Sequence, residues 1–235
     1  MTEVLKLHLA EELNAQLIVD TLFVFDVPVI GDLTISESIF ISWIIILAVL
    51  ILCLIFTHNL KVHNPGKRQL AAEAAVTWIQ NLIKDMLGEE AIEYTEYLMA
   101  VLIYIGLANT IGLFGMKPPT KDLNITIALA VMSIIVVQVA GIRKKRVGGW
   151  LKSFTQPVAI VTPLNIMELA IKPLSLCMRL FGNVIGAFVI MEIIKIVVPI
   201  GIPVVFSAYF DIFDGLLQAY VFVFLTSIYI KEAIE

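Results

Sequence analysis

The sequence of 235 residues is short of charge. Charged residues make up 15% of it, against about a quarter of an average soluble domain. The net charge of −4 leaves no basic excess to contact phosphate, which excludes a nucleic-acid binder. Hydrophobic residues make up 60%, which excludes a disordered chain and a soluble globular domain. The composition therefore indicates a polytopic membrane protein.

Cysteine and histidine are also scarce. The two cysteines, Cys53 and Cys177, lie in apolar runs, so they supply neither a disulfide framework nor a metal site. His8 lies near the N-terminus, and His58 and His63 follow the first apolar run, away from the acids of the membrane segments. No Ser/His or metal-ligand spacing appears. We therefore expect no metal and no cofactor, and the histidines argue against an intramembrane enzyme.

Long apolar runs predict an all-α fold that crosses a membrane. About 20 apolar residues in a helix span a hydrocarbon core of roughly 30 Å. Three runs approach this length: 39–56, 98–115 and 123–142. A fourth run, 163–230, breaks once at the turn signal Pro199–Pro203 and supplies two more helices. The sequence therefore predicts about five membrane helices.

The last two helices are too long to stand upright in a membrane. At about 1.5 Å per residue, 163–198 would be roughly 54 Å long and 204–230 roughly 40 Å. Both lengths exceed the hydrocarbon core, so we expect a steeply tilted hairpin. Pro173 offers a bend in its first helix.

The loops predict how the chain is divided and oriented. Apolar positions at helical spacing in 70–92 predict an amphipathic helix, which lies on the membrane surface or packs on other protein. Lys and Arg are concentrated in alternate loops, so these loops are expected in the cytoplasm, with the N-terminus outside and the C-terminus cytoplasmic. Six segments follow: an external N-terminal segment (1–36), a first transmembrane helix (37–58), a cytoplasmic segment with the amphipathic helix (59–96), two transmembrane helices (97–142), a basic cytoplasmic loop (143–162) and the tilted hairpin (163–235).

The first helix of the hairpin carries a polar stripe. Its members follow one another at spacings of 4, 3, 4, 4 and 3, which places them on one helix face: Glu168, Lys172, Ser175, Arg179, Asn183 and Gly186. A charge near the middle of a membrane costs at least about 2.5–3.5 kcal/mol. Arg179 has no acid one turn away on its own helix, so it either pairs inside the bundle or acts on another molecule.

A fixed charge at Arg179 predicts a particular kind of chemistry. A guanidinium stays protonated, because its pKa is above about 12. A carboxylate arriving from another chain would lose its proton beside it, and would be neutralised by a proton or a cation when facing lipid. Arg179 would thus force discharge of the ion, and the moving carboxylate must come from a partner.

The second helix of the hairpin carries acids. Ser207, Asp211, Asp214 and Gln218 follow at spacings of 4, 3 and 4 and share a face. Counting outward from the turn places Asp211 level with Glu192, and Gln218 at a depth comparable to that of Arg179. We therefore expect a carboxylate cluster of Glu192, Asp211 and Asp214 on the outer side of an Arg–Gln pair. Lys195, three residues after Glu192, could neutralise Glu192 instead.

The stretch KPLSLCMRLFGNVIGAFVI, from Lys172 to Ile190, closely resembles the signature of subunit a of F-type ATP synthases around its essential arginine. The likeness extends to LLQAYVFVFLTSIYI around Gln218, to PTKDLNIT at 119–126, and to the pattern of spans. It implies a stator subunit of a bacterial cell membrane whose tilted hairpin embraces a rotating ring of c subunits. It also implies contact with peripheral-stalk b subunits, with the rest of the complex and with membrane lipid, and none with nucleic acid.

On this resemblance, Arg179 separates two offset half-channels that pass H⁺ or Na⁺ to and from the ring carboxylates, and the chain makes no covalent bond. Asn183 and Gln218 are its polar neighbours, and Asp122 and Asn124 lie near the outer entrance. The expected ion-path residues are Arg179, Gln218, Asn183, Glu192, Asp211, Asp214, Asp122, Asn124, Glu168 and Ser175. Many relatives have an acid where this chain has Ala187–Val189, so its outer acids differ from theirs. A self-contained channel or secondary transporter and a passive assembly scaffold are the alternatives.

Overall fold

The computed structural model describes residues 21–27, 31–58, 60–61, 66–155, 161–197 and 201–235. Five of its helices are long and apolar enough to span a membrane, which confirms the predicted all-α membrane fold. They cover Glu37–Thr57, Glu89–Phe114, Leu123–Ser153, Thr162–Met191 and Val205–Ile234.

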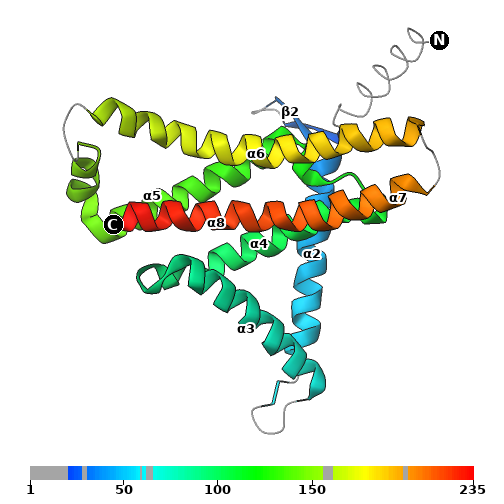
Figure 1. Cartoon of the computed structure of the whole chain (residues 1–235), viewed down its shortest axis with the longest axis horizontal. Coiled ribbons are helices and arrows are strands. Elements are labelled where there is room, and N and C mark those ends of the chain that lie inside the picture. Colours follow the sequence, from blue (N-terminus) through cyan, green and yellow to red (C-terminus); the bar gives the residue numbers. More distant parts are fainter. Residues whose placement is uncertain (1–20, 28–30, 59, 62–65, 156–160, 198–200) are drawn as a thin grey trace.

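The buried side chains of helix α2 (Glu37–Thr57) all lie in its first half. Ile41 and Ile45 are buried there, and Tyr104 of α4 (Thr95–Thr110) donates to Ser42 at 2.9 Å. Most of the other apolar side chains of α2 are exposed, as expected for a helix in lipid. Figure 1 shows α2 standing across the direction of the later helices.

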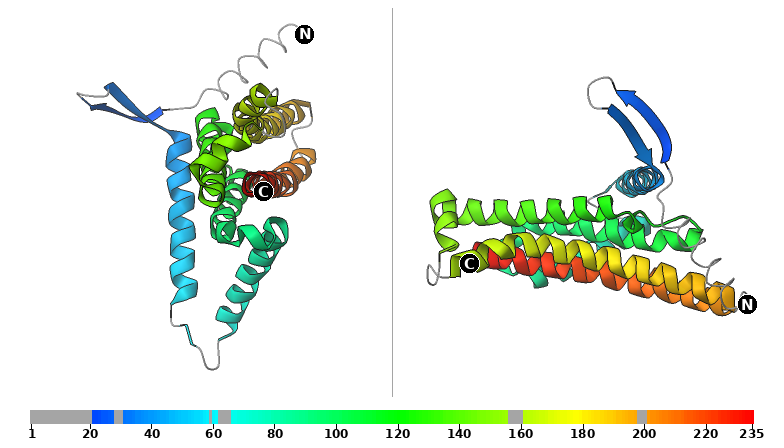
Figure 2. Two further views of the ribbon diagram at one scale, coloured as in Figure 1. Left: turned by 90° about the vertical axis from the view of Figure 1, so that its left-hand side faces the viewer. Right: turned by 90° about the horizontal axis from the view of Figure 1, so that it is seen from above.

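A small antiparallel β-hairpin precedes α2, which the sequence analysis did not predict. Strands β1 (Thr21–Val27) and β2 (Gly31–Ser36) pair with Val24 opposite Thr34. It lies at the end of α2 that holds Ser36, which caps the helix by accepting from the backbone N–H of Ile39 at 3.4 Å (Figure 2). The membrane-spanning part of the chain remains entirely helical.

The amphipathic segment forms α3 (Lys67–Leu87), and the 3-10 helix η1 (Glu89–Tyr94) joins it to α4. Ile83 and Leu87 at the end of α3 are buried in the main core. Leu70, Val76 and Trp78, nearer the start of the helix, are exposed. The end of α3 therefore packs on protein, whereas its earlier turns leave apolar side chains exposed, as an interfacial helix does.

Helix α5 (Leu123–Ser153) continues into the stretch expected to be a basic loop. Arg and Lys are good helix formers, so the end of the apolar run at Ile142 does not end the helix. The chain kinks instead at Arg146, whose φ of 59° lies in the left-handed region. Beyond the kink, the Trp150 indole N–H donates to Gln138 at 2.9 Å, so the end of α5 folds back on its own span.

The hairpin consists of α6 (Thr162–Val197) and a returning arm made of α7 (Ile202–Ser207), the π-helical stretch η5 (Ala208–Asp214) and α8 (Gly215–Ile234). Its two arms run side by side and cross the direction of α2, so they cannot all lie parallel to that span (Figures 1 and 2). α6 packs mainly on α5, and α8 packs on α4 and α5. The core lies between these helices and includes Leu98, Ile105, Leu180, Phe222 and Val223.

Gly215 allows α8 to approach α4 closely. A Cβ placed on Gly215 would lie 2.9 Å from the Cβ of Asn109, closer than side chains come in practice. Glycine therefore fixes where α8 meets α4, and with it the depth at which the side chains of η5 and α8 lie.

Candidate functional site

The polar stripe of α6 meets polar side chains of the returning arm at two places. We call this line the polar seam; its members are Glu168, Lys172, Ser175, Arg179, Asn183, Asp214, Gln218 and Glu232. In the middle of the hairpin, the Asn183 amide donates to the side-chain oxygen of Gln218 at 2.7 Å. Near the end of α8, the Lys172 ammonium lies 2.9 Å from a carboxylate oxygen of Glu232. Ser175 and Arg179 lie between these two contacts on the same face of α6.

Gln218 is the most deeply buried member of the seam, with 2% of its surface exposed. Its amide nitrogen has no hydrogen-bond partner within the described parts of the chain. The side chain borders a cavity of about 30 Å³ that Asn109, Asn183 and Asp214 also line. A water molecule needs about 10–15 Å³ and two or more polar partners, so this cavity has room for one that accepts from Gln218.

Arg179 is half-buried and forms no hydrogen bond or ion pair with any residue that the structure describes. The alternative of an ion pair inside the bundle finds no support there, because Glu168 lies 3.5 Å from Lys172 instead. Gln218 bonds Asn183 rather than Arg179, one helical turn from the expected pair. Asn183 lies 15 residues before residue 198 and Gln218 lies 14 residues after residue 204, so the two lie at matching distances from the turn.

The face of α6 beside Arg179 is open. A Cβ on Gly182 or on Gly186 would meet nothing within 4 Å among the described atoms. These two glycines form a Gly-x-x-x-Gly pattern, which in membranes lets a second helix approach closely. The unpaired arginine thus lies next to a surface on which another helix could pack.

Lys172 joins the two arms near the end of α8. Besides its contact with Glu232, its ammonium lies 3.5 Å from Glu168 and 5.3 Å from the centre of the Tyr229 ring. Glu168, expected in the ion path, is therefore held in a salt bridge. Ser175 is half-buried on the next turn of α6.

The structure separates the acids that the sequence placed on one face. Asp211 accepts from the Ser207 hydroxyl at 2.6 Å, and its carboxylate lies over Gly112, whose added Cβ would be 2.7 Å from it. Asp214 lines the small cavity with Gln218. The π-helical turn of η5 explains the difference, because it is wider than an α-turn and shifts the face of each later residue. The side chains of Glu192 and Lys195 lie outside the described residues.

Asp122 and Asn124 lie at the start of α5. Asp122 is 4% exposed and caps the helix, accepting from the backbone N–H of Asn124 at 2.9 Å. Ser36 also donates to it at 3.5 Å, while the Asn124 side chain is exposed. Next to the cap, Lys121 lies 3.7 Å from the centre of the Phe188 ring and ties this turn to α6.

Two polar residues of the site were missed in the sequence. The Thr120 hydroxyl donates to the Asn109 side-chain oxygen at 2.7 Å, and the Asn109 amide donates to the backbone oxygen of Gly215 at 3.0 Å. Both side chains are buried. Asn109 could have been found, because an amide inside the apolar run 98–115 must be bonded to be tolerated in a membrane.

The described part of the molecule contains no candidate metal site. No group of three or more His, Cys, Asp or Glu side chains lies close enough there to hold an ion.

Comparison with known proteins gives a consistent result. The family described as ATP synthase A chain matches residues 39–231. ATP synthase subunit a of Moorella thermoacetica is 34% identical over 208 residues, which cover 88% of this chain and 94% of the relative. ATP synthase subunit a 2 of a Bradyrhizobium species is 30% identical, covering 87% and 92% of the two chains. The chloroplastic ATP synthase subunit a of Oedogonium cardiacum is 32% identical, covering 88% and 86%.

Proposed function

The chain belongs to the ATP synthase A chain family, and we propose from this premise that it is the ion-translocating stator subunit of an F-type ATP synthase. Two offset half-channels pass H⁺ or Na⁺ to and from the carboxylates of a rotating c-ring, and Arg179 separates them. The subunit makes and breaks no covalent bond itself. Its partners are the c-ring, the peripheral-stalk b subunits, the rest of the complex and membrane lipid, in a bacterial cell membrane with the N-terminus outside and the C-terminus in the cytoplasm.

The observation that carries this proposal is the guanidinium of Arg179, which lies in a membrane-spanning helix and has no ion-pair partner among the residues that the structure describes. A charge in that position is costly unless it is paired or reaches water. The other cation of the stripe, Lys172, already has two acids of its own chain. A carboxylate on a neighbouring molecule is the group that would complete the environment of Arg179, and the ring carboxylate has this chemistry.

The surface beside Arg179 supports a helix as that neighbour. Gly182 and Gly186 leave room for a backbone to approach, and apolar side chains such as Met178 and Ile190 are exposed near them. Small residues at a membrane interface favour close helix packing. We therefore place the rotor helix against this face of α6.

The two half-channels follow the two ends of the seam. On the outer side we assign Asp211, Asp214 and the water-sized cavity beside Gln218 and Asn183 to the path. Glu192, Asp122 and Asn124 belong to the wider outer entrance. On the cytoplasmic side, Glu168 and Ser175 lie along the face that leads to Arg179.

Substitution of Arg179 tests the proposal. In the whole complex reconstituted in liposomes, Arg179→Ala should abolish ATP synthesis driven by an imposed ion gradient. Arg179→Lys should restore little, because an ammonium lacks the planar fork and loses its proton readily when buried. Arg143→Ala is the matched control, since Arg143 is an exposed residue of α5 away from the seam.

Two results would contradict the proposal. Full ATP synthesis by Arg179→Ala at wild-type assembly would remove the role of the guanidinium. Ion conduction by the purified chain alone in liposomes would instead favour a self-contained channel, because a stator subunit needs the ring carboxylate to carry the ion.

A further inference from the structure

A cluster of basic residues lies where α5 leaves its apolar run. We call residues 143–152 the basic turn; it contains no acid, and its cations are Arg143, Lys144, Lys145, Arg146 and Lys152. The apolar run of α5 ends at Ile142, so the first cation follows directly on the part of the helix that is apolar enough to cross the membrane. In Figure 1 the basic turn forms one edge of the molecule, close to the C-terminus.

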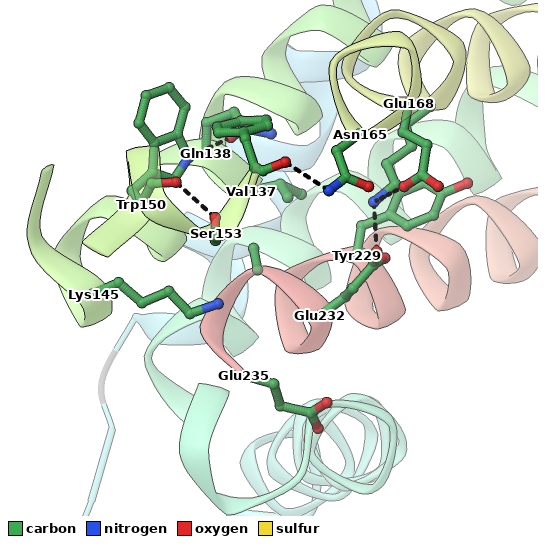
Figure 3. A pocket seen from close by; sticks show the side chains of 13 residues that line it. Val137, Gln138, Lys145, Trp150, Ser153, Asn165, Glu168, Tyr229, Glu232 and Glu235 are labelled. Carbon is green, nitrogen blue, oxygen red and sulfur yellow. Dashed lines mark hydrogen bonds and ion pairs between the residues drawn. The ribbon is translucent and has the colours of Figure 1, made fainter. Parts of the chain in front are cut away.

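Most of the charge of the basic turn is not balanced by the chain itself. Lys144 lies 3.2 Å from a carboxylate oxygen of Glu90, and Lys145 points into a pocket that Glu232 and Glu235 also line (Figure 3). The other three cations are exposed and form no ion pair with any residue that the structure describes: Arg143, Arg146 and Lys152. The basic turn therefore presents a positive surface to its surroundings.

The backbone of the basic turn is held in one arrangement. Arg146 has a φ of 59°, which is uncommon for any residue other than glycine. Such a conformation persists only where the surrounding structure fixes it. Here the Trp150 indole N–H donates to Gln138 at 2.9 Å, and the Asn165 amide of α6 donates to the backbone oxygen of Phe154 at 2.9 Å. The cations are thus carried on a preformed surface.

Exposed apolar side chains lie among these cations. Val147 and Leu151 are 59% and 58% exposed, and each is next to a cation in the sequence. The rings of Trp150 and Phe154 are half-buried and meet edge to face, with their centres 4.9 Å apart. Cations, apolar side chains and aromatic rings at the end of a span are typical of a segment that lies in the membrane interface.

We propose that the basic turn binds the phosphate headgroups of anionic phospholipids, which hold the end of α5 at the membrane surface. A guanidinium can bind a phosphate through two parallel N–H bonds, and an ammonium binds it as a point charge. The position directly after a span favours lipid over an acidic protein, because anionic headgroups attract basic segments at this depth. This lipid surface does not depend on the role of Arg179, since no residue of the basic turn belongs to the polar seam.

Fluorescence quenching of Trp150 tests this assignment. Trp43→Phe and Trp78→Phe leave Trp150 as the one tryptophan of the full chain, which is reconstituted in phosphatidylcholine bilayers with a brominated lipid. Bromine quenches tryptophan only at close range, so brominated phosphatidylglycerol and brominated phosphatidylcholine report which lipid lies beside the turn. The anionic lipid should be preferred at least about fivefold, the factor that corresponds to about 1 kcal/mol for one basic side chain at an anionic surface.

Neutralising the three unpaired cations should remove this preference. The triple variant Arg143→Gln, Arg146→Gln, Lys152→Gln should bring the ratio of the two lipid affinities to about one. The double variant Arg143→Lys, Arg146→Lys keeps the charges and should keep the preference. Salt of about 1 M, at which the Debye length is about 3 Å, should lower the ratio in the parent chain and needs no substitution in the turn.

The matched control removes three exposed cations elsewhere, with Lys61→Gln, Lys67→Gln and Arg68→Gln. These residues lie at or just before the start of α3, at a different corner of the molecule (Figure 1). The control changes the net charge by the same amount as the triple variant, so an effect of overall charge would appear in both. Its ratio at Trp150 should equal that of the parent chain.

The outcomes separate lipid from the alternatives. A ratio near one in the parent chain, or a ratio that neither the triple variant nor salt lowers, would overturn the lipid site. An equal loss in the matched control would also overturn it, because overall charge would then be the cause. A ratio near one, together with loss of another subunit from whole complexes that carry the triple variant, would show that the basic turn docks on protein instead. The Arg179→Ala experiment is unaffected by any of these results.

Discussion

Replacing Gln218 by Met removes the amide while nearly keeping the volume, so it isolates the polar contribution of the most buried residue of the seam. The bond from Asn183 is lost, and a hydrogen bond between membrane helices is worth about 0.6 kcal/mol on average and at most about 1.7. The amide nitrogen of Gln218, which has no partner among the described residues, disappears too. A buried unsatisfied donor costs about 1–3 kcal/mol, so its removal offsets the lost bond if the cavity is dry.

Two assays of Gln218→Met therefore give distinct answers. Thermal unfolding of the purified chain in detergent should show a loss of at most about 1.7 kcal/mol if a water occupies the cavity, and no loss or a gain if it is dry. Ion-driven ATP synthesis should fall in either case, because the polar contact beside Arg179 is gone. The double variant with Asn183→Ala should show a coupling of about 0.6 kcal/mol, which is nearly threefold in the equilibrium constant. Strictly additive effects would refute the bond, and unchanged synthesis would refute the place of Gln218 in the ion path.

Three further substitutions probe the packing of α8 and the outer acids. Gly215→Ala should destabilise the chain by about 1–3 kcal/mol in the same unfolding assay, because its methyl group would overlap the Asn109 Cβ, whereas Gly148→Ala, which meets nothing within 4 Å, should be neutral. Asp211→Asn and Glu192→Gln should each slow ion flux from the outer side in reconstituted complexes. Normal flux in both single variants and in the double variant would move the outer path elsewhere, toward Asp122.

The length of the apolar runs was enough to predict the spans and the tilted hairpin. Membrane thickness is a fixed external scale, so a run of 163–198 can be compared with it without any knowledge of packing. The stripe on α6 followed equally directly from helical spacing. Contacts between helices did not follow in this way. The partner of Lys172 on α8, Glu232, comes after the apolar run, and no local pattern connects two residues 60 positions apart.

Irregular backbone explains most of the other differences. The expected face of Asp211 and Asp214 assumed an ideal α-helix, and the π-helical turn of η5 moves the two carboxylates to different surroundings. The kink at Arg146 likewise depends on tertiary contacts, since Trp150 reaches back to Gln138. The π-helical turn has no signal in residue type. Asn109 does have such a signal, because its amide interrupts an apolar run.

The two cations on the stripe of α6 have opposite surroundings, and this difference bears on how a stator could avoid wasting energy. One elementary charge that crosses about 100 mV releases about 2.3 kcal/mol, which is lost if the ion passes without turning a ring. Lys172 forms salt bridges with two acids of its own chain, so its charge is neutralised inside the subunit. Arg179 has no such partner among the described residues, so its charge is left for an acid on another molecule. On the proposed function, an ion is then discharged where an acid of the ring meets Arg179, and its passage is coupled to the movement of that ring.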